Sequence, residues 1–222
     1  MIVAPSLRGR RVDFPEALIY NEIEVSLMPK KNSRNTKSKI VSAAWRLFYE
    51  NGYDDTTIEE IIFESGTSKG SFYHYFDSKD ALLGSLAYLF DEKYEELEED
   101  LTPGQNTIET LLMLNRELFS MVENTIDLEL IKKLYSTQLV TRSEKQLLDH
   151  NRVYYKLLRR LVVAGRESGE LTCRMSVGET VRYYAFCERS LIYDWCLVGG
   201  EYSLCERAAD LMPFLLKKIE NK

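Results

Sequence analysis

Apolar residues recur along most of this chain of 222 residues at the three- and four-residue spacing of an amphipathic helix. The stripe formed by Ile40, Ala44, Leu47 and Phe48 predicts a first helix over 34–51, which Gly52 ends. No alternating run is long enough to indicate a β-strand. Together with two short helices described below, the pattern predicts an all-α protein of about nine helices. The other expected helices cover 78–100 and about 106–123, 127–139, 143–167, 176–198 and 203–220.

Capping signals mark where the later helices begin. In each of them Asn or Ser is followed three residues later by Glu or Gln, an arrangement in which side chains satisfy the free N–H groups of a first turn. Thr102, Pro103 and Gly104 end the helix over 78–100 and divide an N-terminal domain, 34–94, from a C-terminal domain, 102–222. The capping pairs are Asn106/Glu109, Ser143/Gln146, Ser176/Glu179 and Ser203/Glu206.

The stretch 57–76 is the most informative part of the chain. Thr57 and Glu60 form a capping box that begins a short helix, and Ser68 can cap a second one. Gly66 lies between them, where a positive φ allows a sharp turn. Two short helices joined in this way predict a helix-turn-helix. Their apolar residues, assigned to the core, are Ile58, Ile61, Ile62, Phe72 and Phe76.

The polar face of the second short helix carries hydroxyls, an amine, an imidazole and bare backbone, but no carboxylate. Such a surface suits a polyanion such as nucleic acid. A surface helix that happens to contain aromatic residues is the alternative. The residues in question are Thr67, Ser68, Lys69, Gly70, Ser71, Tyr73, His74 and Tyr75.

The order of these residues is informative as well. SKGSFYHYFxSKDALL, preceded by AAxxLFxExGYxxTTIxxI, closely resembles the DNA-binding domain of TetR-family transcriptional repressors over roughly 34–89. The resemblance implies a three-helix helix-turn-helix domain followed by a helical ligand-binding and dimerisation domain. It leaves Tyr75 open between contact and packing. The positions that it implies for contact with phosphates or base edges are Thr57, Thr67, Ser68, Lys69, Gly70, Ser71, Tyr73, His74 and Lys79.

The resemblance also implies a homodimer formed through the helices at 176–198 and 203–220, with double-stranded DNA as the partner. Trp195 is expected near that interface, and the core of its own subunit is the alternative. We expect a cytoplasmic repressor of a palindromic operator that a small molecule releases, with no cofactor and no metal. The effector cannot be read from the sequence. Residues that could line its pocket, although each fits plain core better, are Phe90, Met113, Phe119, Met121, Tyr135, Tyr155 and Tyr183.

Two other classes of function compete with DNA binding. Residues 66–70 match G-x-S-x-G, the nucleophile elbow of hydrolases, but that motif needs a preceding strand, and a helix is expected here. No P-loop, H-E-x-x-H or G-x-G-x-x-G motif supports an enzyme. A helical adaptor that binds another protein is the third possibility, and a gel shift on upstream DNA separates it from a repressor.

Composition and charge refine this prediction. The net charge is −6, yet Pro29 to Tyr49 holds six bases and no acid, whereas EELEED over 95–100 carries five acids. This distribution indicates a locally basic end on an acidic body. No apolar run reaches the ~18 residues of a membrane helix. The four cysteines, expected to be buried thiols rather than redox sensors, are Cys173, Cys187, Cys196 and Cys205.

Residues 1–28 do not resemble the family and show no clear period. We expect a disordered extension, or a start codon assigned upstream of a native start at Met28. A short segment docked on the body is the alternative.

Overall fold

The computed structural model describes residues 36–102, 104–140 and 145–219, and the N-terminal extension over 1–28 lies outside this range. Within these residues the structure contains ten α-helices and one 3-10 helix. The prediction of an all-α protein is therefore confirmed. Every helix in the described ranges is too short or too polar to span a lipid bilayer.

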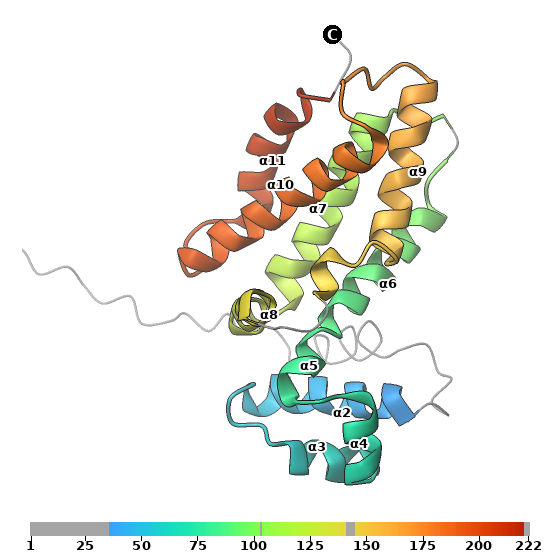
Figure 1. Cartoon of the computed structure of the whole chain (residues 1–222). Helices are drawn as coiled ribbons and strands as arrows, with labels where there is room; N and C mark the ends of the chain where they lie inside the picture. The colour runs from blue at the N-terminus through green and yellow to red at the C-terminus, as the bar shows by residue number, and fades with distance from the viewer. Residues whose placement is uncertain (1–35, 103, 141–144, 220–222) are drawn as a thin grey trace, which may run out of the picture.

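Three helices form a small unit at one end of the molecule, residues 36–76, which we call the head (Figure 1). They are α2 (Thr36–Asn51), α3 (Ile58–Ser65) and α4 (Lys69–Tyr75). Each packs on the other two. Ile40, Ile61 and Phe72 are completely buried where the helices meet, so the apolar stripes predicted from the sequence form a shared core.

The segment that joins the head to the rest of the protein differs from the single helix expected over 78–100. It consists of α5 (Lys79–Leu83) and α6 (Leu86–Glu99). At the junction, the N–H groups of Ser85 and Ala87 donate to carbonyls three residues earlier, which tightens the turn. Trp45 of α2 also donates its indole N–H to the Ser85 hydroxyl at 2.7 Å. Contacts with other helices fix this junction. The spacing of apolar residues in the sequence cannot predict such contacts.

The remaining helices form a larger unit, called the body (Figure 1). They are α6 together with α7 (Thr107–Thr125), α8 (Leu128–Val140), the 3-10 helix η1 (Gln146–Leu148), α9 (Val153–Glu167), α10 (Val177–Leu197) and α11 (Leu204–Leu216). The helices α6, α7 and α9 pack on one another, and α10 packs on α8, α9 and α11. In the figure, α8 lies at the end of the body nearest the head, and it contacts α5.

The helix predicted over 143–167 is wrong in its first part. Residue 143 lies outside the described residues, and α9 begins only at Val153. No side chain of its own segment caps α9. Instead Asp91 of α6 accepts the Tyr154 N–H at 3.1 Å. The other three predicted starts have the expected cap, because Asn106, Ser176 and Ser203 each accept the N–H three residues on.

Trp195 lies in the core of its own subunit, so the alternative to the interface prediction holds. Its side chain is 5% exposed, and its indole N–H donates to the Tyr202 carbonyl at 2.9 Å. The cysteines are free thiols: Cys187 and Cys196 are buried, and Cys173 and Cys205 are half-buried.

Candidate functional site

The turn between α3 and α4 is held by the interactions that the sequence predicted. Thr57 accepts the Glu60 N–H, and the Glu60 carboxylate accepts the Thr57 N–H at 2.7 Å, which completes a capping box. Gly66 ends α3 with φ 61°, a left-handed conformation that favours glycine. Ser68 then caps α4 by accepting the Ser71 N–H at 3.0 Å. Because Ser68 follows a helix and caps another, the nucleophile-elbow geometry is absent from this turn.

Most of the predicted contact residues are accessible in this arrangement. Thr57 caps α3, Lys79 begins α5, and the others lie in the turn or in α4. Phe72 and Phe76 point inward, so α4 is anchored by its aromatic side and presents its polar side. Tyr75 is 40% exposed, which leaves it available for contact. The exposed members are Thr57, Ser68, Lys69, Gly70, Tyr73 and His74, whereas Thr67 and Ser71 are half-exposed.

Gly70 leaves a stretch of α4 backbone uncovered. A Cβ placed there would have only the Ser68 hydroxyl oxygen near it, at 3.8 Å, which is an ordinary contact. The fold therefore does not require glycine at this position. Bare backbone allows a ligand to approach the first turn of a helix, whose free N–H groups attract anions.

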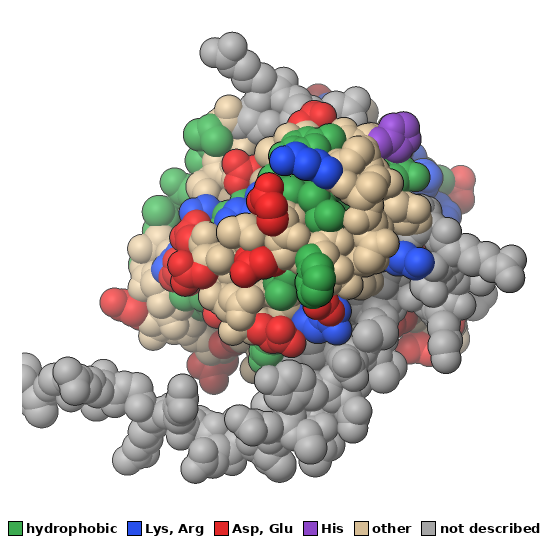
Figure 2. Space-filling view, turned by 90° about the horizontal axis from the view of Figure 1, so that it is seen from below, with side chains coloured by type: hydrophobic (Ala, Val, Ile, Leu, Met, Phe, Trp, Pro, Cys, Tyr) green, Lys and Arg blue, Asp and Glu red, His purple; other side chains and the backbone are tan. Residues whose placement is uncertain are grey.

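Charge on the head is mixed rather than uniformly basic. Residues 36–76 contain six acids and four bases. Figure 2 shows that carboxylates gather toward one side of this end of the molecule and uncharged polar surface spreads over the other. Lys69 is exposed and forms a loose ion pair with Glu59 at 3.6 Å. Lys30, Lys31 and Arg34, part of the predicted basic cluster, lie outside the described residues.

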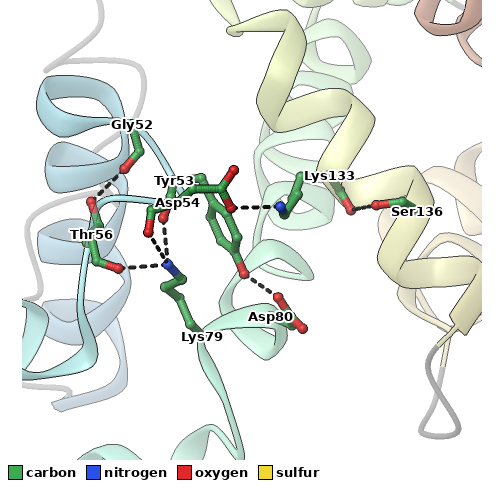
Figure 3. A network of polar contacts seen from close by, with 8 residues as sticks. All are labelled: Gly52, Tyr53, Asp54, Thr56, Lys79, Asp80, Lys133 and Ser136. Atoms are coloured by element: carbon green, nitrogen blue, oxygen red, sulfur yellow. Dashed lines mark hydrogen bonds and ion pairs between the residues drawn. The ribbon is translucent and has the colours of Figure 1, made fainter.

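Lys79 has different partners from those expected of a phosphate contact. Its ammonium donates to the carbonyls of Tyr53 at 2.6 Å, Thr56 at 2.7 Å and Asp54 at 3.2 Å (Figure 3). It also lies 4.4 Å from the centroid of the Tyr53 ring. An ammonium has three N–H donors, so this loop occupies all of them. The phosphate role of Lys79 stays a prediction, and the structure gives it a second role as the clamp of the α2–α3 loop.

The same loop connects the head to the body. Lys133 of α8 donates to the Asp54 carboxylate at 2.7 Å and lies over the Tyr53 ring, whose hydroxyl bonds to Asp80 of α5 (Figure 3). The bond to Lys133 lowers the pKa of Asp54 and raises that of Lys133. Burial is the main cause of the raised pKa of Tyr53. Head, α5 and α8 thus share one polar network.

The body contains a cavity of about 550 Å³ between α8, η1 and α10. Tyr135, Gln138 and Leu139 of α8 form one wall, and Arg189 and Tyr193 of α10 form another. This volume is in the range of small-molecule sites. By sequence Tyr135 is one of several residues that could line a pocket, although each fits plain core better. Nothing in the sequence points to Arg189, because the wall exists only when α8 and α10 are packed together.

A buried polar cluster lines a smaller cavity of about 40 Å³ that shares Tyr135 and Arg189 with the first. There Glu188 accepts bonds from Asn115 at 3.0 Å and Tyr154 at 2.6 Å, and burial raises the pKa of its carboxyl despite these donors. The Tyr94 hydroxyl also faces this cavity. Burial and the nearby Glu188 raise its pKa, yet it makes no hydrogen bond of normal geometry. A buried hydroxyl without a hydrogen-bond partner favours a polar group placed beside it in the cavity.

Comparisons with known proteins agree with this arrangement. Residues 40–86 match the family model of bacterial regulatory proteins of the tetR family. The fatty acid metabolism regulator protein of Bacillus subtilis (strain 168) is 24% identical over 196 residues, which cover 86% of this chain and 100% of the relative. An uncharacterized HTH-type transcriptional regulator in the lacX 3'region of Lactococcus lactis subsp. lactis is 54% identical over 48 residues, 22% of this chain and 24% of the relative.

Solved structures share the fold. The crystal structure of Thermus thermophilus FadR, a TetR-family transcriptional repressor, superposes with a TM-score of 0.68 at 22% identity, covering 85% of this chain and 96% of that one. The capped helix-turn-helix, the family match that spans it and these full-length likenesses lead to one conclusion. The chain is a DNA-binding transcriptional regulator whose residues 40–86 form a TetR-family DNA-binding domain, and its fold is that of TetR-family proteins.

Proposed function

We propose that this regulator is a dimeric repressor that binds a palindromic operator through α4 and releases it when a small molecule occupies the body cavity. The main support is α4 itself, which is acid-free, exposed on its polar side and fixed from behind by Phe72. A short helix held in this way fits the major groove, where side chains at its start reach base edges.

We assign roles to the contact residues by their chemistry. Lys69 can donate to guanine acceptors, and Ser71 can serve several base edges. Tyr73 and His74 can donate to phosphates or pack on sugars. We assign Thr57, Thr67, Ser68 and Gly70 to the phosphate backbone, and Lys79 to support of the α2–α3 loop.

The dimer interface is proposed to lie on α10 and α11. Phe186 and Leu197 of α10 are 59% and 66% exposed, and Phe214 of α11 is 67% exposed. The two α10 residues are eleven positions apart, about three helical turns, so they share one face of the helix. Exposed apolar faces of this kind are typical of association surfaces. A two-fold dimer presents two heads and therefore favours a palindromic site.

The position of α8 suggests how a ligand reaches the head. Tyr135, Gln138 and Leu139 of this helix line the body cavity, while Lys133 of the same helix bonds to Asp54 in the head. A ligand that shifts α8 would move or break that bond. Two structures with a similar fold are FadR of Bacillus subtilis in complex with stearoyl-CoA and FadR of Thermus thermophilus in complex with lauroyl-CoA. An acyl-CoA is accordingly one candidate effector.

The Lys69→Ala variant tests the proposed function. We expect wild-type protein to shift the DNA upstream of its own gene in a gel, and to select a palindrome from random sequences. The Lys69→Ala variant should lose about tenfold to a hundredfold of discrimination at particular base pairs, because a bidentate donor to guanine is removed. Uniform weakening across a set of operator variants would instead place Lys69 on phosphate. Absence of any sequence-specific shift by wild-type protein would refute the repressor.

Replacing Gly70 separates DNA contact from folding. Gly70→Ala adds a methyl group to open space and favours the helix by up to about 1 kcal/mol, so the head should melt no lower than wild type. Operator affinity should fall about tenfold if the backbone here donates to phosphate. Gly178→Ala is the matched control, since Gly178 is also the second residue of its helix, α10, in the body. Unchanged affinity in Gly70→Ala would exclude close approach of DNA.

The bond between α8 and the head is expected to support DNA binding. Lys133→Gln should lower operator affinity about two- to fivefold, a modest effect because the ion pair is exposed. Asp54→Asn should have a similar effect, and the two losses should not add, because both variants remove one interaction. Lys132→Gln is the control, since Lys132 pairs with Glu129 of its own helix. If the double variant lost as much operator affinity as the two single variants added together, the proposed link between α8 and the head would be contradicted.

A further inference from the structure

The body cavity has an unusual charge for this protein. The whole chain carries a net charge of −6, yet the described residues that line the larger cavity include Lys145 and Arg189 and no carboxylate. Most of the remaining wall is aromatic or aliphatic, as with Tyr135, Leu147 and Tyr193. The wall therefore combines apolar surface with positive charge.

Arg189 is the better placed of the two cations. Its guanidinium is half-buried and donates to the Tyr155 hydroxyl at 3.0 Å. None of the ion pairs found among the described residues involves Arg189. Glu188, the next residue in the chain, instead receives bonds from Asn115 and Tyr154 in the smaller cavity. Glu188 still interacts electrostatically with Arg189, but it forms no ion pair with it. A guanidinium without an ion-pair partner in an apolar wall favours an anion, because charge-assisted bonds strengthen as water is excluded.

The rim of the cavity offers the complementary surface. Leu139 is 72% exposed and Leu148 is 47% exposed, and both line the same cavity. A ligand with an apolar part would cover these side chains and remove apolar surface from water. The cation and the apolar rim together fit a ligand that has both a negative group and an apolar part.

We propose that the effector is a small amphipathic anion, an apolar body that carries one carboxylate, sulfonate or comparable group, bound with that group against Arg189. This inference rests on the proposed function, in which the cavity holds the effector. It adds the chemical class of the ligand and the residue that recognises its charge.

Two probes that differ by a single sulfonate group test the class. Anilinonaphthalene sulfonate is an apolar anion, and phenyl naphthylamine is the same ring system without the sulfonate. Each is titrated by fluorescence into the full-length protein in the absence of DNA. We expect wild type to bind the anion at least about tenfold more tightly than the neutral probe, a preference of about 1.4 kcal/mol. Arg189→Gln should abolish this preference, while Arg182→Gln, an exposed arginine of the same helix, should keep it.

A second pair of variants covers the case in which Arg189→Gln fails to fold. Ser190 lines the cavity beside Arg189 and is half-exposed, so a longer polar side chain can be accommodated there. Ser190→Glu places a carboxylate in the wall, where it pairs with the guanidinium and repels an anion. It should lose the preference for the anionic probe, whereas Ser190→Gln, of equal size, should retain it.

Equal probe ratios in wild type, Arg189→Gln and Ser190→Glu would overturn the proposal, and so would equal affinity of wild type for both probes. Operator binding is measured separately on the same proteins. A protein that binds its operator but shows no charge preference refutes only the effector class. A protein with the preference but without sequence-specific DNA binding refutes only the repressor function.

Discussion

Phe186→Arg is expected to leave the subunit folded and to lower affinity for the palindromic operator by about a hundredfold or more. The side chain is 59% exposed on α10, so the substitution disturbs no core of its own subunit. At the proposed interface the new arginine would be buried without a partner for its charge. The cost of burying that charge would exceed what the dimer contact contributes, so the dimer should dissociate. Two linked heads bind a palindrome about 10²- to 10⁴-fold better than one head, because the second contact becomes intramolecular.

Sedimentation, helicity and operator titration of Phe186→Arg together decide this prediction. We expect a folded monomer with weak binding that depends little on whether one or two half-sites are present. Val163→Arg is the control, since it adds the same charge to a partly exposed apolar position on α9. A folded monomer with wild-type affinity would show that dimerisation is unnecessary. A folded dimer with unaltered affinity would remove Phe186 from the interface.

Asp91→Ala is expected to destabilise the body by about 3–5 kcal/mol, because it leaves a buried charge without its partner. Asp91 and Arg152 are 7% and 8% exposed, and their side chains form two hydrogen bonds of 3.0 Å between α6 and α9. The same carboxylate caps α9 through the Tyr154 N–H. The variant therefore loses a buried ion pair and a helix cap together.

A second contact between the same helices provides the control. Glu98 of α6 pairs with Arg160 of α9, but both side chains are substantially exposed. Glu98→Ala should therefore cost about 1 kcal/mol or less, because water screens the pair. Replacing Asp91 by Leu and Arg152 by Met in one protein should recover much of the loss, since no uncompensated charge remains. Equal denaturation midpoints for Asp91→Ala and Glu98→Ala would contradict this account.

Much of the local structure follows from the sequence alone. The capping box at Thr57, the left-handed Gly66 and the cap at Ser68 depend on residues a few positions apart, so their types and spacing predict them. The burial of Phe72 and Phe76 follows from helical period in the same way. These signals define the two helices of the reading head and the acid-free surface that α4 presents.

Other features depend on residues that only the tertiary structure brings together. The break between α5 and α6 involves Trp45, and the start of α9 depends on Asp91, which lies more than 60 positions earlier. Trp195 is apolar enough for an interface or a core, and its bond to Tyr202 places it in the core. Lys79 has the chemistry of a phosphate ligand, but folding brings three loop carbonyls to its ammonium.

The cavity is the clearest case of a feature that the sequence could not predict. Tyr135 and Arg189 lie more than 50 positions apart in the chain, and neither carries a local signal of ligand binding. Helical periodicity says which side chains leave the solvent, but it does not say which of them meet or where packing leaves a space. The sequence alone thus determined most of the helices, most of their caps and the polar surface of α4. The three-dimensional packing decided the cavity, its charge and its connection through α8 to the head.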